Sequence, residues 1–300
     1  MGAGAIGAYF GARLARLYST WFVARGAHLQ TMQQHGIRIS SIHGDMHEYP
    51  GCVEDPSTLD GSFDLIIFSV KSYDTPKAIE QIRPVVSDHT IILSLQNGIE
   101  NVGQLNQAFD PDQVIPATAN IGVMVTEPGV VEHSAYGLVT VGTTEDNTNE
   151  RAINQIYHWM RSAEIDIKIS EQMTETIWKK FTWNSVFNMT TGLLNVTTDQ
   201  LWVADENIPP ICRMLFEELQ EAARLRDGIE LEDDYLQAIV DRTRGMGAFK
   251  TSTYQDRQKG KPLEYEAFTG AIVRIGRRYN QRFPHYEMLH EMYKIISGAQ

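Results

Sequence analysis

Cysteine is scarce in this 300-residue chain, which carries only Cys52 and Cys212. Two cysteines so far apart predict neither a disulfide framework nor a cysteine zinc site, and we expect no bound metal. No apolar run approaches the roughly 20 residues needed to cross a membrane. The first residues also lack the basic start and cleavage site of a signal peptide. These absences predict a protein of the reducing cytoplasm without a membrane partner.

Positive charge is also in deficit, because 26 Lys and Arg residues stand against 38 Asp and Glu residues, for a formal net charge of -12. Nucleic-acid-binding proteins normally present a basic surface, so the composition argues against a nucleic-acid partner. An anionic cofactor or substrate would need positive groups placed locally. With 42% hydrophobic and 21% charged residues, the chain is typical of a globular protein and long enough for two domains.

The chain opens with MGAGAIGAYFG. Gly2, Gly4 and Gly7 have the G-x-G-x-x-G spacing of a dinucleotide-binding turn, with Ala5 and Ile6 between the last two glycines. Such glycines let the backbone approach a pyrophosphate, which meets the N–H groups of the following helix. We therefore predict a cofactor turn followed by a helix. A glycine-rich helix start that binds nothing is the alternative.

The strand that normally precedes this turn is missing, because only Met1 stands before Gly2. In a doubly wound fold that strand lies near the centre of the sheet, so its loss would leave neighbouring strands with unpaired backbone groups. We expect the recorded start to be an internal methionine, with the strand encoded upstream. The alternative is a truncated protein with a weakened cofactor site.

Short β-rich runs alternate with helical segments over residues 1–170, which predicts an α/β domain of the Rossmann type with a largely parallel sheet. The expected strands are 20–23, 64–70, 90–98, 113–125, 129–135, 137–142 and 165–170. Residues 171–300 instead show long segments with apolar residues at helical spacing. We therefore predict an NADP-binding domain over 1–170 and an all-α substrate domain over 171–300.

Arg25 follows the strand expected at residues 20–23. A dinucleotide site that reads a free ribose 2′-hydroxyl prefers an acidic residue at this strand end, whereas an arginine suits a 2′-phosphate. Arg25 therefore favours NADPH over NADH, with a solvated surface arginine as the alternative. His28, just downstream, is a weaker candidate for lining the adenine end.

Lys71 and Asn97 each follow an expected buried strand, in the stretches SVKSYDT and LQNGIEN. Because ligands of open α/β sheets bind beyond the carboxyl ends of the strands, both residues are candidates for cofactor or substrate contacts. The alternatives are a solvated loop lysine and an asparagine that forms the turn before Gly98.

The stretch IWKKFTWNSVFN places Lys180, Asn184 and Asn188 at i, i+4 and i+8. On a helix this spacing forms one stripe, and here its neighbours are apolar. Burial moves the pKa of a lysine toward neutrality, which suits a proton donor to a developing alkoxide. Lys180 is therefore the candidate general acid. The alternative is that Lys179 and Lys180 are both solvated.

A last group of polar residues lies in STYQDRQKGKPLEYEAFTG. Ser252 and Asp256 are four residues apart, and Glu264 stands at the start of a further helix. A glutamate at a helix start interacts favourably with the helix dipole. For Glu264 alone, that structural role is the simpler interpretation.

Together these stretches resemble ketopantoate reductase (2-dehydropantoate 2-reductase), the family that reduces ketopantoate to pantoate with NADPH in pantothenate biosynthesis. The resemblance covers essentially the whole chain after the missing strand. It rests on the order and spacing of GAGAIGAYFGARLA, FVARGAHLQ, SVKSYDT, LQNGIEN, PGVVEH, WKKFTWNSVFN and LEYEAFTG. It implies a Rossmann domain, a helical domain and an active site in the cleft between them.

The resemblance also implies roles for the candidate residues. Lys180 is implied as the general acid, and Glu264 as the residue on the substrate's hydroxyl side. Substrate-binding or active-site positions are matched by Asn97, Asn184, Asn188, Ser252 and Asp256. Cofactor-binding positions are matched by the turn from Gly2 to Gly7, Arg25, Lys71 and Asn97.

Two departures from the family pattern touch cofactor binding. One is the missing strand, and the other is the stretch RLYSTWFV, which lacks the usual glycine turn and is one residue short. Two further functions stay open: a reductase of another 2-keto acid, and a non-catalytic or truncated NADP-binding relative. We also expect a small 2-keto acid as substrate and a homodimer through an apolar surface of the helical domain.

Overall fold

The computed structural model describes residues 1–202 and 208–298, which form two compact units. Unit 1 comprises Met1–Asn97 and Asn101–Met173, and unit 2 comprises Gly98–Glu100 and Thr174–Gln300. Unit 1 is mixed α/β and unit 2 is helical, so the fold class predicted from the sequence is confirmed. The sequence did not predict that Gly98–Glu100 would pack with the helical unit.

A seven-stranded sheet forms the centre of unit 1, with the order β3-β2-β8-β7-β6-β5 and with β9 paired to β8. Its strands are β2 (Ile37–Ser41), β3 (Met46–Glu48), β5 (Leu65–Phe68), β6 (Ile91–Ser94), β7 (Val114–Glu127), β8 (Val130–Val141) and β9 (Ile167–Ile169). β5, β6 and β7 run parallel to one another, whereas β7 and β8 are antiparallel. The sheet is largely parallel, as expected, because four of its six strand pairs are parallel, but its longest pair is antiparallel.

The antiparallel pair follows from the connection between its strands. Glu127 pairs with Val130 across a tight turn that contains Gly129 at a φ of +74°. So short a connection joins only antiparallel strands. In β8, Tyr136 and Gly137 have φ values of 60° and 127°. This irregularity interrupts the apolar pattern, which is why the sequence predicted two strands where the structure has one.

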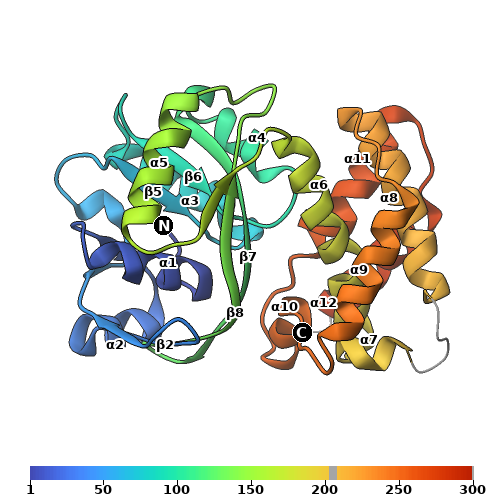
Figure 1. The fold of residues 1–300 in the computed structure, drawn as a ribbon, viewed down its shortest axis with the longest axis horizontal. Helices are drawn as coiled ribbons and strands as arrows, with labels where there is room; N and C mark the ends of the chain where they lie inside the picture. Colours follow the sequence, from blue (N-terminus) through green and yellow to red (C-terminus); the bar gives the residue numbers. More distant parts are fainter. Residues whose placement is uncertain (203–207, 299–300) are drawn as a thin grey trace. The chain divides into compact units, whose positions relative to one another are not determined.

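A second, two-stranded parallel sheet in unit 1 consists of β1 (Trp21–Val23) and β4 (Gly51–Val53). The helices of this unit are α1 (Ala5–Ala15), α2 (Gly26–His35), α3 (Thr75–Ile82), α4 (Asn101–Asn106) and α5 (Glu150–Ser162). The buried side of α1 belongs to the same apolar core as β7 and β8. Figure 1 shows the start of the chain within this unit, between α1 and β5.

Unit 2 is built from helices and from two π-helical turns. Its elements are α6 (Met173–Trp183), η5 (Asn184–Asn188), α7 (Met189–Leu194), α8 (Pro210–Asp227), α9 (Asp233–Gly245), α10 (Ser252–Gln258), η7 (Glu266–Gly270), α11 (Ala271–Tyr279) and α12 (Pro284–Gly298). In α8 the buried positions follow the i, i+3, i+4 pattern of a helix with one apolar face, as in Cys212, Leu215 and Phe216. Among the described residues, no helix is both long and apolar enough to span a membrane.

Candidate active site

Two glycines of the turn between Met1 and α1 occupy positions where a larger side chain would not fit. Gly2 has a φ of +84°, and a Cβ atom there would lie 2.7 Å from Val70 Cγ1. A Cβ atom on Gly7 would lie 2.5 Å from the carbonyl oxygen of Gly2. Ser69 holds that same carbonyl, because its hydroxyl donates to Gly2 O at 3.0 Å. The turn is thus packed against the residues that follow β5.

Gly4 has a different environment, because no atom lies within 4 Å of the position that a Cβ would take. Gly4 is the N-cap of α1, and no side chain caps this helix end. The backbone N–H groups of the first turn, including those of Ala5 and Ile6, are therefore suited to bind an anion. No acidic residue in the first turn would repel that anion. The open space at Gly4 fits a pyrophosphate.

Arg25 lies directly after β1, where the sequence predicted a reader of the 2′-phosphate. Its guanidinium donates to Asp74 Oδ2 at 2.7 Å, and 67% of the Arg25 side chain is exposed. Asp74 ends the short 3-10 turn η2 (Ser72–Asp74), which follows β5. A 2′-phosphate would therefore compete with a carboxylate for Arg25. Nothing in the sequence spacing predicts this ion pair.

His28 has a structural role that the sequence did not predict. The Gly129 N–H donates to His28 Nδ1 at 2.9 Å, so the ring carries its proton on Nε2, which donates to Ala3 O at 3.0 Å. The imidazole thereby ties the glycine turn to the turn between β7 and β8. Both ring nitrogens therefore bind backbone groups, and the expectation that His28 lines the adenine end stays a prediction.

Lys71 and Asn97 follow the carboxyl ends of β5 and β6, which are neighbouring parallel strands. Gln96 joins the two strand ends, because its Nε2 donates to Val70 O at 3.0 Å and to Thr75 Oγ1 at 2.7 Å. Its Oε1 is buried without a hydrogen-bond partner, although buried polar atoms normally have one. A ligand with an N–H donor would satisfy it. The sequence did not identify Gln96, because the only feature that could have done so is its position directly before Asn97.

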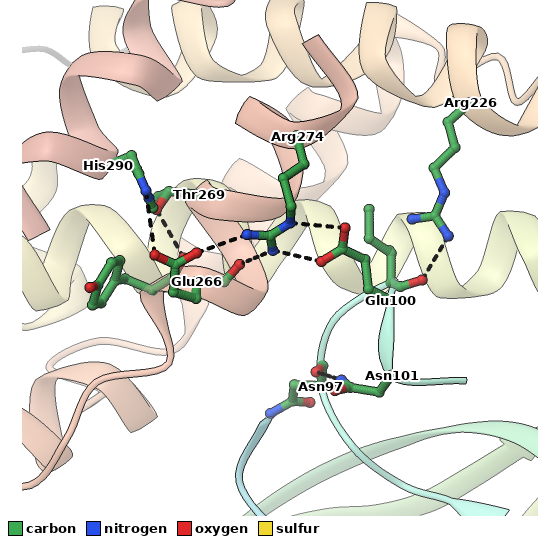
Figure 2. Close-up of polar contacts among 10 residues, drawn as sticks. Asn97, Glu100, Asn101, Arg226, Glu266, Thr269, Arg274 and His290 are labelled. Atoms are coloured by element: carbon green, nitrogen blue, oxygen red, sulfur yellow. Dashed lines mark hydrogen bonds and ion pairs between the residues drawn. The ribbon is translucent and has the colours of Figure 1, made fainter. Parts of the chain in front are cut away.

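The segment after Asn97 is fastened to the helices of unit 2, as Figure 2 shows. Arg226 donates to Ile99 O at 2.8 Å, and Arg274 binds the two carboxylate oxygens of Glu100 at 3.2 and 2.6 Å. Asn97 itself belongs to unit 1, where its carbonyl accepts from Asn101 Nδ2 at 2.6 Å. The chain therefore passes from unit 1 into unit 2 after Asn97 and returns to unit 1 at Asn101. Hydrogen bonds from Arg226 and Arg274 hold the short segment between them.

The same arginine extends this polar chain into η7 (Figure 2). Arg274 donates to Glu266 Oε2 at 2.8 Å and to Glu266 O at 2.6 Å. His290 lies 3.5 Å from Glu266 Oε1 through Nε2 and bonds Thr269 Oγ1 at 3.0 Å through Nδ1. Sequence reasoning missed this network, because its members are far apart in the chain and no motif links them.

Lys180 lies near the end of α6, and the two candidate asparagines bound the π-helical turn η5. The sequence predicted one regular helical stripe, but the structure inserts a π turn between Asn184 and Asn188. Such turns occur frequently at functional sites. Both asparagines are buried, at 5% and 0% exposure. The stripe thus consists of a lysine followed by two buried amides.

Asn188 connects this stripe to α10. Its Nδ2 donates to Asn184 Oδ1 at 3.3 Å and to Ser252 Oγ at 2.9 Å, while its Oδ1 accepts from Thr253 N at 3.0 Å. Asn184 in turn donates weakly to Lys180 O at 3.4 Å. Unit 2 therefore links the backbone of Lys180, both asparagines and Ser252 by hydrogen bonds, although Lys180 and Ser252 are 72 positions apart in the sequence.

The two consecutive lysines of α6 are both half-buried, but their amines have different neighbours. Lys179 is 44% exposed in its side chain and pairs with Glu175 at 2.5 Å. Burial lowers the pKa of Lys180 to about 8, while the nearby Glu264 carboxylate opposes this shift. Glu264 is itself buried, at 9% exposure. The amine of Lys180 can therefore change its protonation state at a pH of about 8.

Asp256 lies on α10, one turn after Ser252, and is partly exposed. Its carbonyl accepts from Lys261 N at 2.9 Å, which closes the loop that leads to Glu264. The polar residues of unit 2 thus come from α6, η5, α10 and the loop before η7. Among the described residues, no cluster of three or more His, Cys, Asp or Glu side chains could hold a metal ion.

Two family models match most of the chain and show the family to which it belongs. The family described as "Ketopantoate reductase PanE/ApbA" matches residues 1–146, and its C-terminal counterpart matches residues 172–297. The chain belongs to the ketopantoate reductase family. It is therefore an oxidoreductase of that family, and the resemblance found in the sequence motifs is confirmed.

Individual relatives of this ketopantoate reductase family member are distant but full in length. A 2-dehydropantoate 2-reductase of Mesorhizobium japonicum is 28% identical, over 94% of this chain and 92% of its own. The crystal structure of 2-dehydropantoate 2-reductase from Geobacter metallireducens is 28% identical, covers 98% of both chains and has a TM-score of 0.90. A D-mandelate dehydrogenase solved with NADH and anilino(oxo)acetate shares the fold, with a TM-score of 0.90 at 21% identity over 99% of this chain and 97% of its own.

The environments of Gly4 and Gly7 predict that alanine will have different effects at the two positions. Gly4→Ala meets no protein atom, so its effect on the thermal unfolding midpoint should be limited to the small cost of alanine at a helix N-cap. The variant should weaken NADPH binding about tenfold or more, because the methyl group fills the space open to a pyrophosphate. Gly7→Ala forces the turn apart and lowers the midpoint by roughly 3 °C or more. Calorimetry and NADPH fluorescence titration measure the two effects. Equal loss of stability in both variants would contradict the assignment of Gly4 to a ligand.

The lowered pKa of Lys180 predicts an alkaline limit on reduction. The protonated amine is lost as the pH rises through about 8, so turnover should fall above that pH. Glu264→Gln removes the carboxylate that favours the ammonium form, and should move this limit to lower pH. Profiles of kcat against pH for the two proteins test both statements. An unchanged limit in the variant would show that the titrating group is not coupled to Glu264.

Proposed function

We propose that this protein reduces ketopantoate (2-dehydropantoate) to (R)-pantoate with NADPH, a step of pantothenate and coenzyme A biosynthesis. Membership of the ketopantoate reductase family supports the reaction class. The observation that carries the proposal is the environment of Lys180, whose pKa is lowered to about 8 by burial beside Glu264. A proton donor of this kind is what the reduction of a ketone to an alcohol requires.

Unit 1 is proposed as the NADP-binding domain and unit 2 as the substrate domain. NADPH would supply the hydride for the carbonyl carbon. The backbone of Gly4, Ala5 and Ile6 would bind its pyrophosphate, with Lys71 and Asn97 beyond the ends of β5 and β6 on the nicotinamide side. Because these groups stand on a turn and on strand ends that hydrogen bonds already fix, little reordering would accompany binding.

Lys180 is proposed to hydrogen-bond the ketone oxygen and to donate a proton to it as negative charge develops there. An ammonium with little surrounding water interacts more strongly with that charge than a solvated one. Glu264 keeps a useful fraction of the lysine protonated, since its carboxylate raises the pKa that burial lowers. Its carboxylate is also proposed to accept a hydrogen bond from the substrate's hydroxyl group.

Asn184 and Ser252 are proposed to hold the substrate through their polar groups, with Asp256 at the rim of the same region. Asn188, which is 0% exposed, is proposed to maintain the geometry of this substrate-binding group. The Asn188 amide is bound on both sides, by Ser252 Oγ and by Thr253 N, so its orientation is fixed before substrate arrives. Fixed amides lower the cost of aligning substrate and proton donor, and alignment is a large part of enzymatic rate enhancement.

Arg25 is proposed to bind the 2′-phosphate of NADPH. A guanidinium binds phosphate through several hydrogen bonds, and 67% of the Arg25 side chain is accessible. The ion pair with Asp74 opposes this preference, because the carboxylate both occupies the arginine and repels a phosphate. Asp74 could also accept a bond from a free 2′-hydroxyl, so the balance between NADPH and NADH depends on this pair.

The adjacent lysines provide a matched test of the proposed function. Lys180→Ala should lower NADPH-dependent turnover of ketopantoate by about 10²–10⁴-fold, the usual contribution of a general acid, with nearly unchanged NADPH affinity. Lys179→Ala removes the same side chain from the same helix. It should keep turnover within about twofold, since it breaks only an exposed ion pair with Glu175 and the contact of the amine with the Tyr235 ring at 5.5 Å. Steady-state kinetics of the two variants give the answer. Similar turnover in both would refute the role of Lys180.

The Arg25–Asp74 pair predicts two opposite shifts in cofactor preference. Asp74→Asn frees the guanidinium and should tighten NADPH binding roughly two- to fivefold, the range of an exposed ion pair, with no gain for NADH. Arg25→Glu should weaken NADPH far more than NADH. Dissociation constants for both cofactors, obtained without substrate, measure these shifts independently of catalysis. Equal effects on NADPH and NADH would reject the 2′-phosphate assignment.

A further inference from the structure

Arg274 of α11 binds two separate parts of unit 2 through all three of its guanidinium nitrogens, as Figure 2 shows. Its Nε and Nη2 atoms donate to the two carboxylate oxygens of Glu100 at 3.2 and 2.6 Å. Its Nη1 atom donates to Glu266 Oε2 at 2.8 Å, and Nη2 also donates to Glu266 O at 2.6 Å. A guanidinium can do this because its donors form a rigid planar fork. Arg274 therefore holds both the carboxylate and the backbone of Glu266.

The π turn η7, which begins at Glu266, is tied by hydrogen bonds to the residues before it. Ala267 N donates to Glu264 O at 3.0 Å, and Thr269 Oγ1 donates to Tyr265 O at 2.9 Å. Only Tyr265 separates Glu264 from the turn. A contact that holds Glu266 in place therefore also holds Glu264.

The ion pair between Arg274 and Glu266 lies against Gly270, where a side chain would disturb it. A Cβ atom at Gly270 would lie 3.0 Å from Arg274 Nη1 and 3.2 Å from His290 Cε1, and it would also meet Glu266 Oε2. Gly270 has a φ of -61°, which is ordinary helical geometry, so the backbone conformation does not require glycine here. The missing side chain instead leaves room for the ion pair.

The other segment that the guanidinium binds is in turn connected to the helix that carries Lys180. Arg226 Nη2 donates to Ile99 O at 2.8 Å. The next residue of α8, Asp227, accepts from Trp178 Nε1 at 2.7 Å, and Arg226 Nε lies 3.5 Å from the same carboxylate oxygen. Trp178 is 1% exposed and stands on α6, two residues before Lys180. A chain of polar contacts within unit 2 therefore runs from α6 to η7.

We propose that Arg274 is a positioning residue of the reductase, an inference that rests on the proposed function. By binding η7 to the segment Gly98–Glu100, its guanidinium keeps the Glu264 carboxylate beside the Lys180 amine. In this role Arg274 contacts neither substrate nor cofactor, and it acts on the proton donor only through Glu264.

The proposal fixes the direction in which the pKa of Lys180 responds to loss of Arg274. Burial lowers this pKa to about 8, and the Glu264 carboxylate opposes the shift. If η7 is released and Glu264 moves away, the pKa falls further. Loss of the positive charge of Arg274 would by itself raise the pKa, because a nearby cation disfavours the ammonium form. General loosening of unit 2 would also raise it, since water would reach the amine. Only displacement of Glu264 lowers it.

NMR titration of the lysine Cε signals in the full chain measures this response, with the Lys180 signal assigned from its loss in Lys180→Ala. Arg274→Met should lower the pKa of Lys180 by about 0.5 or more. Arg274→Lys keeps the charge but loses the planar fork, so it should also lower the pKa. Combined with Glu264→Gln, Arg274→Met should add no further shift, because residues that act through one another are not additive.

Arg224→Met provides a matched control in the same unit. Arg224 binds both carboxylate oxygens of Glu221 at 2.9 and 2.6 Å, so the substitution breaks another two-bond ion pair, in this case within α8. It should leave the pKa of Lys180 unchanged. In parallel, kcat for ketopantoate should fall about tenfold or more in Arg274→Met, since misplaced catalytic groups lose rate, and should stay the same in Arg224→Met.

A lower pKa in both Arg274 variants, with none in Arg224→Met, supports the proposal. An unchanged or raised pKa in Arg274→Met or Arg274→Lys would overturn it, as would a shift in the double variant that is the sum of the two single shifts. If Arg274→Met does not fold, Arg274→Lys decides the question alone. The titration needs no substrate. A chain that fails to reduce ketopantoate would therefore reject the proposed function, while the titration would still decide whether Arg274 positions Glu264.

Discussion

The poorly solvated amine of Lys180 is the feature on which the proposed chemistry of unit 2 depends. Burial disfavours the charged form of Lys180, and Glu264 partly restores it. Their balance places the pKa of the amine at about 8, where both protonation states are accessible. Lys179, one residue earlier on the same helix, pairs with Glu175 at the surface. The fold thus distinguishes two adjacent, chemically identical residues by environment alone.

The amides around Lys180 depend on a local irregularity of the helix. The π turn Asn184–Asn188 is entirely buried, and the bonds of Asn188 to Ser252 and Thr253 tie it to α10. Unit 1 arranges its proposed cofactor groups by different means, through a glycine turn and the ends of β5 and β6. Each unit therefore fixes its polar groups with its own hydrogen bonds, which reduces what ligand binding must order.

Local patterns in the sequence predicted the parts of the protein that depend on neighbouring residues. The glycine spacing predicted the turn before α1, and the apolar runs predicted β5 and β6. The helical spacing predicted that Lys180 and the two asparagines would lie along one helical segment. In each case the residues that determine the conformation are adjacent or a few positions apart, so periodicity and turn chemistry are sufficient.

Those local patterns could not predict contacts between residues that are far apart in the sequence. The Arg25–Asp74 and Glu100–Arg274 pairs join side chains from separate segments. Gln96 is notable only because its Oε1 is buried without a partner. The antiparallel β7–β8 pair was missed because Tyr136 and Gly137 interrupt β8 with positive φ angles. The two backbone partners of His28 were likewise not predicted, because tertiary structure sets them.

The proposed reaction of this chain is the transfer of a hydride from NADPH to ketopantoate. The most direct measurement follows NADPH oxidation by the purified chain with and without ketopantoate, together with assay of pantoate. The account predicts oxidation that requires ketopantoate and yields one pantoate per NADPH consumed. A chain that binds NADPH and ketopantoate but oxidises none would contradict it.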